Sequence, residues 1–360
     1  MDIRSSARQH KRPEEEALLM VSQCSALQPQ DRVRLLTQTP DAATLTGLTH
    51  LDVERRIGRP LRSQWNPRRL ARGVSRLRWW LQGGSDRHLL WVGDQAYPEH
   101  LALVYDPPAI LFGRGDLGAL NYPRVGVVGT RRPDQTGLSA AAELGASLAA
   151  SGVAVVSGLA RGIDGAAHRG VIGAQTGHGE YGECDVSVTG AAAGAEADVA
   201  AGAAPAIAVL GCGIDRIYPV EHKELAGEIV ARGGLLLSEY PPGTPPARYQ
   251  FPARNRIVVG LSQVLVVVQA PSPSGALISA EFALAEGRDV LVHTVGRSWS
   301  GCRQLLDDGA RLIETVGEVL QERILAEPAD EARTAELLRR AQEAKLSLFA
   351  GLSTKQEEHR

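Results

Sequence analysis

The sequence predicts an α/β protein with an extended Rossmann-like fold: a doubly wound, mostly parallel sheet preceded by a small helical domain. Three observations carry this prediction. Between about residues 122 and 316, short apolar runs alternate with helical stretches, which is typical of a sheet built from β-α units. The runs are almost continuously apolar, as in strands buried on both faces. Glycine accounts for 39 of the 360 residues and aromatic residues for only 4%, which favours close-packed α/β layers over a β-sandwich.

Residues 1–88 predict a helical N-terminal domain. EEEALLMVSQCSAL and DRVRLLTQ carry apolar residues at three- and four-residue spacing, and PRRLARGVSRLRWWLQGG continues the pattern to a stop at Gly83-Gly84. The end of this domain is rich in arginine, with ten between residues 53 and 89: Arg55, Arg56, Arg59, Arg62, Arg68, Arg69, Arg72, Arg76, Arg78 and Arg87. Such an excess can serve an anionic partner, although a solvated helical face is the more common explanation of a charge run.

The rest of the chain divides into three parts. Residues 89–121, broken by Pro107-Pro108, read as a connector of short strands and turns. Residues 122–326 form the Rossmann-like domain, with strands expected at RVGVVG, VAVVSG, AIAVLG, GLLLSE, VLVVVQA and DVLVHT. An Ala/Gly-rich stretch at about 176–205 is long for a connection inside a compact domain and is interpreted as an insertion. Residues 327–360 predict a helix and a charged tail, too short for a further domain.

Composition excludes several classes of protein. The four cysteines are scattered, with neither CxxC spacing nor a histidine at ligand spacing, so we expect no disulfide framework and no metal site. The N-terminus lacks the apolar core of a signal peptide, and no run approaches the roughly 18 apolar residues of a membrane span. We therefore expect a cytoplasmic protein without a membrane segment. No motif calls for a cofactor.

Four expected strands end in polar or glycine-rich loops, at the sheet edge where open α/β sheets bind ligands. They begin at Gly129-Thr130-Arg131-Arg132, at Ser157-Gly158, at Gly211 and at Ser274-Gly275. Glycines allow close backbone approach, and helix N-termini with arginines bind anions. The first loop lacks the GxGxxG pattern, which disfavours a dinucleotide-dependent oxidoreductase.

Asp164 follows the second loop and allows two structural interpretations. It could cap the next helix, or it could pair with His168 one turn later. No elbow, Walker loop or paired carboxylates appear at any strand exit, so no catalytic residue is assigned. The motif QFPARNRIVVG at residues 250–260 adds two arginines around Asn255. Together the loops are typical of anion binding rather than bond breaking.

In this order, GTRRPDQTG, SGLARGIDGAAHRG, AVLGCGIDRIYP, SEYPPGTPPARYQFPARNRIVVGLS and SGALISAEFALAEGR resemble the DNA-processing protein A (DprA, or Smf) family over about residues 97–319. The resemblance implies an extended Rossmann fold that binds single-stranded DNA, usually as a homodimer, without enzymatic activity. It also implies protection of incoming DNA in natural transformation (competence) and loading of the RecA recombinase.

The resemblance implies that Arg254 and Arg256 bind phosphate and that Asn255 braces the site or reads a base edge. Phe251 is a candidate for base stacking, with core packing as its alternative. The candidate DNA-binding residues are Gly129, Thr130, Arg131, Arg132, Ser157, Gly158, Leu159, Arg161, Phe251, Arg254, Asn255, Arg256, Ser274 and Gly275.

This chain departs from the family pattern in the insertion, in Gln269 where an acidic residue is common, in DVLVHTVGRSWSGC after a strand, and in the expected lack of a winged-helix domain. The alternative function is a nucleotide-binding or nucleotide-processing enzyme of a related Rossmann-like family. Those enzymes carry a PGGxGTxxE motif, whereas PSPSGALISAEFALAEGR lacks the paired glycines and keeps only Glu281 as a candidate carboxylate.

Overall fold

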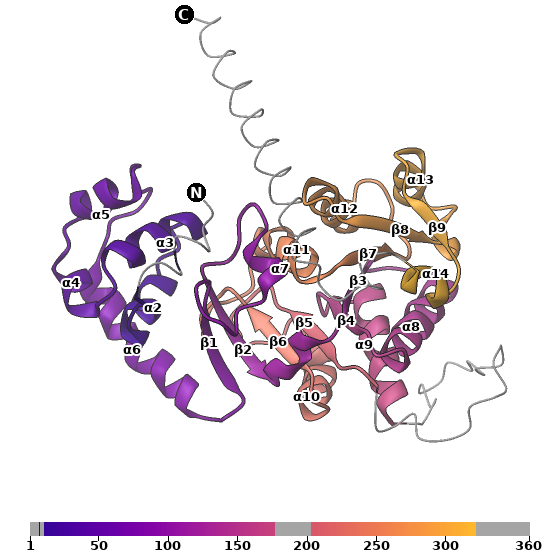
Figure 1. Ribbon diagram of the computed structural model, residues 1–360, viewed down its shortest axis with the longest axis horizontal. Coiled ribbons are helices and arrows are strands. Elements are labelled where there is room, and N and C mark those ends of the chain that lie inside the picture. The colour runs from indigo at the N-terminus through magenta and orange to yellow at the C-terminus, as the bar shows by residue number, and fades with distance from the viewer. Residues whose placement is uncertain (1–6, 8–10, 177–202, 322–360) are drawn as a thin grey trace, which may run out of the picture.

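The computed structural model describes residues 7, 11–176 and 203–321, and its centre is a nine-stranded sheet in the order β1-β2-β6-β5-β4-β3-β7-β8-β9 (Figure 1). Strands β3 to β9 run parallel, and β1 and β2 add an antiparallel edge. This confirms the predicted fold class. The strands are β1 (Arg87–Trp91), β2 (Ile110–Gly115), β3 (Arg124–Val128), β4 (Ala154–Ser157), β5 (Ala206–Val209), β6 (Leu235–Ser238), β7 (Val264–Val267), β8 (Asp289–His293) and β9 (Arg311–Ile313).

The order of the strands reverses at β3. The chain runs outward from β3 through β4 and β5 to β6, then returns to place β7 on the other side of β3. The six runs expected as strands are confirmed as β3 to β8, and β3 to β7 are buried along their whole length. A reversal of this kind opens a crevice beyond the carboxyl ends of the strands, where ligands bind in open α/β sheets.

Helices cover both faces of the sheet (Figure 1). They are α8 (Gln135–Ala150), α9 (Ile163–Thr176) and α10 (Lys223–Ala231) on one face, and α11 (Gln250–Leu261) and α12 (Gly275–Ala285) on the other, with α13 (Ser300–Asp307) and α14 (Val316–Leu320) near the β9 edge. Helices α8 and α9 touch backbone to backbone, because a Cβ at Gly145 would lie 2.2 Å from the Ala167 carbonyl oxygen. The alternation of strands and helices expected between residues 122 and 316 is thus present in the sheet domain.

Residues 89–121, interpreted as a connector, supply part of the sheet. Strand β1 pairs with β2, and β2 pairs with β6 through Phe112 opposite Ser238. The short helix α7 (Glu99–Ala102) and Pro107-Pro108 lie between the two strands. The prolines therefore shape a connection within the sheet domain, and their position in the sequence alone did not reveal that the flanking runs pair.

The N-terminal part forms a helical lobe beside the sheet (Figure 1). Its helices are α2 (Glu15–Ser22), α3 (Pro29–Gln38), α4 (Ala42–Gly47), α5 (His50–Ile57) and α6 (Pro67–Gln82). Their shared core includes Leu18, Leu35 and Leu77, all fully buried. Helix α6 ends at Gly83 as expected, and Trp80 near its end meets Phe112 of β2 edge to face at 6.3 Å between ring centroids. This contact joins the lobe to the sheet.

Two further expectations concern the chain as a whole. No helix among the described residues is long and apolar enough to cross a membrane. Within the same residues, no cluster of His, Cys, Asp or Glu could hold a metal ion. The interpreted insertion lies mostly at 177–202 and the expected C-terminal helix at 327–360, both outside the described residues.

Candidate nucleic-acid interface

A pocket of about 500 Å³ opens beyond the carboxyl ends of β3 and β7, at the point where the strand order reverses. We call it the switch-point pocket. Nine of the fourteen expected residues line it: Gly129, Thr130, Arg131, Arg132, Phe251, Arg254, Asn255, Ser274 and Gly275. The other five, Ser157, Gly158, Leu159, Arg161 and Arg256, are not part of its lining. The motifs therefore converge, but not every residue in them reaches the same space.

The loop after β3 forms one wall of the pocket. The Thr130 amide donates to the Gln269 carbonyl oxygen at 2.7 Å, which ties the ends of β3 and β7 together. A Cβ at Gly129 would lie 2.5 Å from the Ile163 side chain and 2.9 Å from the Gln269 carbonyl oxygen, so only glycine fits between the two strand exits. Arg131 and Arg132 follow as exposed side chains on the pocket wall. Two cations thus stand at the mouth of the pocket.

Gln269, where the resemblance leads us to expect an acidic residue, has a structural role here. Its side-chain amide donates to the Asp134 carboxylate at 2.9 Å, and its side-chain oxygen accepts from the Asp134 amide at 3.3 Å. Asp134 in turn caps α8 by accepting from the Gly137 amide at 2.8 Å. These hydrogen bonds lower the pKa of Asp134, the Thr136 hydroxyl contributing most. Gln269 therefore fixes the start of α8 without adding negative charge to the pocket.

The N-terminus of α12 forms the opposite wall. Ser274 caps this helix by accepting from the Leu277 amide, and Gly275 and Ala276 of the first turn line the pocket. The first N–H groups of a helix have no partner within the helix and carry the positive end of its dipole. A Cβ at Gly275 would have no atom within 4 Å. The helix therefore presents its anion-binding end to open space.

Arg254 forms the floor of the pocket. It is buried, with 4% of its surface exposed; its guanidinium donates to the Val209 carbonyl oxygen and, at 3.2 Å, to the Asn255 side-chain oxygen. Asn255 donates to the Gly275 carbonyl oxygen at 3.1 Å, so the FPARNR motif is linked directly to α12. Burial lowers the pKa of Arg254, and the neighbouring Asp164 carboxylate opposes that shift.

The second loop lies beneath the pocket and shapes it. A Cβ at Gly158 would lie 2.1 Å from the Arg254 guanidinium, so glycine leaves the space that this arginine fills. Ser157 is buried and donates its hydroxyl to the Val127 carbonyl oxygen at 2.6 Å. Leu159 adopts a left-handed backbone (φ 55°), uncommon for a residue with a branched side chain. Arg161 is exposed and forms an ion pair with Glu221.

Neither interpretation of Asp164 is correct. Helix α9 begins at Ile163, and the Asp164 carboxylate accepts from the Gly158 amide at 3.1 Å and the Ala160 amide at 3.4 Å, bracing the preceding loop. Burial raises its pKa. His168 is fully buried, and neither ring nitrogen has a hydrogen-bond partner in the described part of the chain. Burial lowers the pKa of His168 to about 3, so the ring is neutral.

Arg256 points away from the switch-point pocket. It lies two residues after Arg254 in α11, which is about 200° around a helix. Its side chain is 12% exposed and forms ion pairs with Glu239 at 2.6 Å and Asp106 at 3.4 Å. Helix α11 begins at Gln250, so the Phe-Pro step of the motif lies inside its first turn. Arg256 therefore holds α11 against β6 and the α7–β2 connection.

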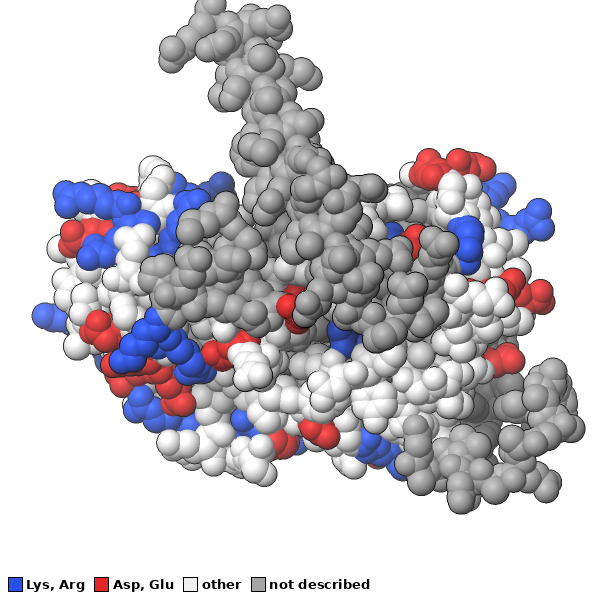
Figure 2. Space-filling view, in the orientation of Figure 1, with Lys and Arg blue, Asp and Glu red and all other residues white. Residues whose placement is uncertain are grey.

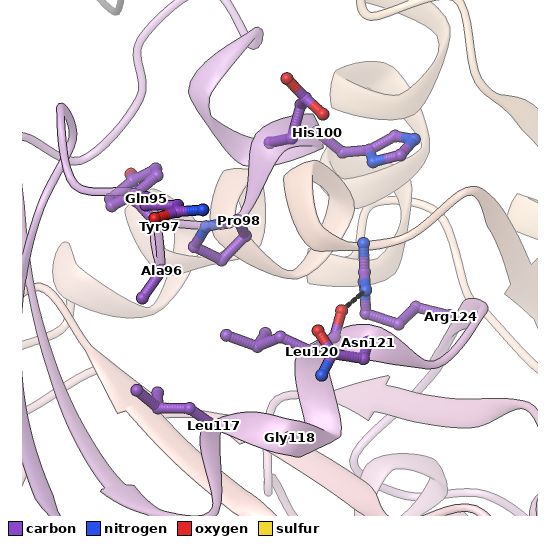
Figure 3. A pocket seen from close by; sticks show the side chains of 11 residues that line it. Gln95, Ala96, Tyr97, Pro98, His100, Leu117, Gly118, Leu120, Asn121 and Arg124 are labelled. Atoms are coloured by element: carbon purple, nitrogen blue, oxygen red, sulfur yellow. Dashed lines mark hydrogen bonds between the residues drawn. The ribbon is translucent and has the colours of Figure 1, made fainter. Parts of the chain in front are cut away.

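Two arginines, Arg124 (buried) and Arg288 (half-buried), hold the other end of α11. Arg124 donates to the Leu261 carbonyl oxygen at 2.7 Å, and Arg288 donates to the Gly260 carbonyl oxygen at 3.0 Å. Arg124 also faces a second cavity, of about 560 Å³, between α7 and the short helix Leu117–Asn121, where it donates to the Leu120 carbonyl oxygen (Figure 3). Burial lowers the pKa of Arg124 to about 10. This cavity lies at the amino end of β3, where Arg124 is the first residue of the strand. The Arg124 side chain binds the C-terminal end of α11.

Aromatic side chains surround the pocket mouth. The guanidinium of Arg131 lies over the Phe251 ring, 5.4 Å from its centroid, and Tyr218 lies 5.2 Å from the same ring. Phe251 is half-buried and packs against Gly211, and it also forms part of the pocket wall. Trp299 also lines the pocket and was missed by sequence reasoning. The departure from the family pattern after β8 was the signal that could have identified it.

The comparisons with known proteins agree with this geometry. Residues 88–178 and 181–323 match the family model of DNA recombination-mediator protein A. The chain belongs to this family. It is 35% identical over 234 residues to DNA processing protein DprA of Streptococcus pneumoniae, covering 64% of this chain and 72% of that protein. It is 33% identical over 316 residues to protein Smf of Escherichia coli, covering 85% and 74% of the two chains.

Two solved DprA structures resemble this one. The S. pneumoniae DprA structure matches with a TM-score of 0.63 at 29% identity, covering 86% of this chain and 98% of that one. A structure of DprA from Helicobacter pylori, described as revealing a single-stranded DNA binding mode, matches with a TM-score of 0.52 at 27% identity, covering 65% and 94%. The family model begins at residue 88, so the helical lobe lies almost entirely outside it.

Proposed function

We propose that this chain binds single-stranded DNA in the switch-point pocket. The observation that carries the proposal is the convergence of the β3 loop, the FPARNR motif and the N-terminus of α12 on one space of about 500 Å³. The H. pylori relative, whose structure concerns single-stranded DNA binding, shares this fold. A phosphate beside Gly275 would accept from the first turn of α12, with Arg131 and Arg132 adding charge at the mouth.

The proposal includes a preference for single strands over duplex DNA. Phe251, Tyr218 and Trp299 lie at or near its mouth, and exposed aromatic rings stack on bases that a duplex keeps paired. Arg254 and Asn255 would support the phosphate from below, because both are held by hydrogen bonds inside the fold. Arg256 would position α11 rather than contact DNA, because its guanidinium is paired with two carboxylates.

We propose the role of a recombination mediator without catalytic activity, in line with the family to which the chain belongs. In this role the protein would coat incoming strands in the cytoplasm during natural transformation and load the RecA recombinase, acting as a homodimer. The nucleotide-processing alternative depends on Glu281, which is exposed on α12 and does not line the pocket. The one carboxylate in the lining, Asp164, is engaged by two backbone amides.

The test compares a labelled single strand, its duplex and a mononucleotide across a salt series, and assays the mononucleotide for release of base or phosphate. Single-strand preference with affinity falling steeply as salt rises, and no release, supports the proposal. Equal affinity for all three ligands, or release of base or phosphate, would favour the alternative.

A further inference from the structure

The exposed side of α6 carries a row of cations that the fold does not use. Arg68, Arg69, Arg72, Arg76 and Trp79 are all exposed and lie within an arc of about 100° around the helix, opposite its buried residues. We call these five residues the α6 stripe. Trp79 is 73% exposed, unusual for so large an apolar side chain.

The structure separates the ten arginines of this region into two groups. Five have partners: Arg55 and Arg56 contact Asp52, Arg59 pairs with Asp31, Arg78 pairs with Glu15 and Glu16, and Arg87 lies over Trp80. The other five are the exposed Arg62 and the four arginines of the α6 stripe, whose side chains form no ion pair or hydrogen bond with any described residue. Contacts within the described part of the fold therefore explain five of the ten arginines, and they explain none of the α6 stripe.

The stripe also opposes the electrostatics of its own helix. Arg68 and Arg69 occupy the first turn, directly after the Asn66 cap and Pro67, where the positive end of the helix dipole disfavours cations. Arg68, Arg72 and Arg76 stand at i, i+4 spacing, where like charges repel by a few tenths of a kcal/mol per pair, on the order of 0.2–0.5. No acidic residue occurs between residues 67 and 82. A solvated helical face would interleave both signs, so this arrangement calls for an anionic partner.

A chain of contacts connects the stripe to the switch-point pocket. A Cβ at Gly243 would lie 3.2 Å from the Arg76 guanidinium carbon, so Arg76 reaches the loop between β6 and α11. The Gly243 amide donates to the Asp215 carboxylate at 2.7 Å, and three residues later Tyr218 meets Phe251. Phe251 lies under Arg131 in the pocket wall.

Exposed cations and aromatic rings lie along this route. Arg216 and Arg248 are exposed in the two loops that it crosses, and Tyr218 and Tyr249 are 44% and 70% exposed. Figure 2 shows Lys and Arg side chains over the lobe of α2–α6, mixed there with acidic ones. Cations interleaved with aromatic rings match a single strand, whose phosphates need charge and whose unpaired bases stack. An acidic protein partner would not require the rings.

We propose that the α6 stripe extends the single-strand binding path, so that a strand anchored in the switch-point pocket continues past Tyr218 and Gly243 onto α6. This inference rests on the proposed function of the pocket. It assigns the helical lobe a role in binding longer strands, while short strands fill the pocket alone.

The experiment measures binding of two labelled oligo-dT strands in a salt series. One has about 6 nucleotides, near the lower end of the roughly 4–16 nucleotides that single-strand binding folds cover, and the other is several times longer. The test variant is Arg68→Ala/Arg69→Ala/Arg72→Ala in the full chain. The matched control, Arg169→Ala/Lys223→Ala/Arg232→Ala, removes three exposed charges on or beside α9 and α10. A third variant, Arg68→Lys/Arg69→Lys/Arg72→Lys, keeps the charge.

We expect the alanine variant to bind the long strand at least tenfold more weakly, with the slope of log affinity against log salt reduced by roughly 0.7 for each lost phosphate contact. The short strand should bind as in wild type, and the lysine variant should restore most of the salt slope. Equal long-strand binding by the alanine variant and the control would overturn the inference while leaving the pocket intact. Failure of wild type to bind the short strand would instead contradict the proposed function.

Discussion

Gly158 and Arg254 occupy one space: a Cβ at Gly158 would lie 2.1 Å from the Arg254 guanidinium. The SGLARGID and FPARNR motifs lie almost one hundred residues apart in the sequence. They meet in the fold because the glycine of the first leaves room for the arginine of the second. Gly158 contributes to the pocket without lining it, because its missing Cβ sets the position of the arginine that does. The lack of a side chain at Gly158 therefore determines where the arginine of the FPARNR motif can lie.

Replacing Gly158 by alanine should displace Arg254. Crowding in a closely packed site costs about 1–3 kcal/mol in the free energy of unfolding, and single-strand affinity should fall at least tenfold. Gly227→Ala is the matched control: its Cβ would meet no atom within 4 Å, and a helical alanine should raise stability by about 0.5–1 kcal/mol. Denaturant unfolding and fluorescence anisotropy measure both quantities. Wild-type affinity in Gly158→Ala would show that Arg254 need not occupy this position.

Gly275 offers a way to block the pocket without disturbing the fold. Because a side chain there meets open space, Gly275→Glu should leave the unfolding midpoint almost unchanged. Its carboxylate would place negative charge at the N-terminus of α12, so single-strand affinity should fall by a factor of ten or more. Gly275→Lys adds comparable bulk with the opposite charge. If glutamate and lysine weaken binding equally, steric exclusion and not anion binding governs this wall.

We expect loss of the Arg256 side chain to lower the stability of the fold and to leave DNA binding largely unchanged, because its guanidinium forms two ion pairs inside the fold. Arg256→Ala would leave Glu239, which is buried, without its partner, and breaking a buried pair costs about 3–5 kcal/mol. The free energy of unfolding should fall by that amount, while molecules that remain folded keep single-strand affinity within about threefold. A variant as stable as wild type that no longer binds DNA would show that Arg256 acts as a phosphate ligand.

His168 predicts a loss of stability in acid. Its pKa falls from 6.5 to about 3 on folding because burial disfavours the charged ring. The unfolded chain therefore binds more protons between these pH values, and this residue's contribution is fully retained above pH 6.5 and lost as pH falls toward 3. Between pH 7.5 and pH 5 the loss from this residue is about 2 kcal/mol.

His168→Phe fills a similar volume and removes the titrating group, so the variant should lose about 2 kcal/mol less than wild type between those two pH values. Urea unfolding at both pH values measures the difference. Parallel pH dependence in the two proteins would mean that the ring already finds a proton-accepting partner in the folded state.

The sequence predicted those parts of the fold that depend on local pattern. The runs that became β3 to β8 are continuously apolar, and the glycine loops after them mark the strand exits. Strands β1 and β2 were missed as members of the sheet because antiparallel pairing with β6 is a long-range contact that no local pattern records. The position of the pocket followed from the reversal of strand order, a general property of such sheets.

The candidate site was predicted less completely, for reasons of geometry. Arg254 and Arg256 have the same chemistry, and only the packing of α11 shows which of them faces the pocket and which forms ion pairs with Glu239 and Asp106. Leu159 and Gly158 act from beneath the pocket through backbone shape. Trp299 reaches the pocket from the segment after β8, which is not one of the four loops singled out in the sequence. The residues that line the pocket differ from those that only support it in the direction of their side chains. Residue type alone does not distinguish the two groups.

The most direct test of the central claim is the affinity of a short oligo-dT for wild type, for Arg131→Ala/Arg132→Ala and for Arg169→Ala/Arg232→Ala, across a salt series. All four side chains are exposed, so both double variants should fold, and the Arg131/Arg132 variant should lose only about 0.5–1 kcal/mol from the contact of Arg131 with Phe251. We expect the Arg131→Ala/Arg132→Ala variant alone to bind at least tenfold more weakly, with the salt slope reduced by roughly 1.4 for two phosphate contacts. Equal affinities and slopes in all three proteins would contradict DNA binding at the switch-point pocket.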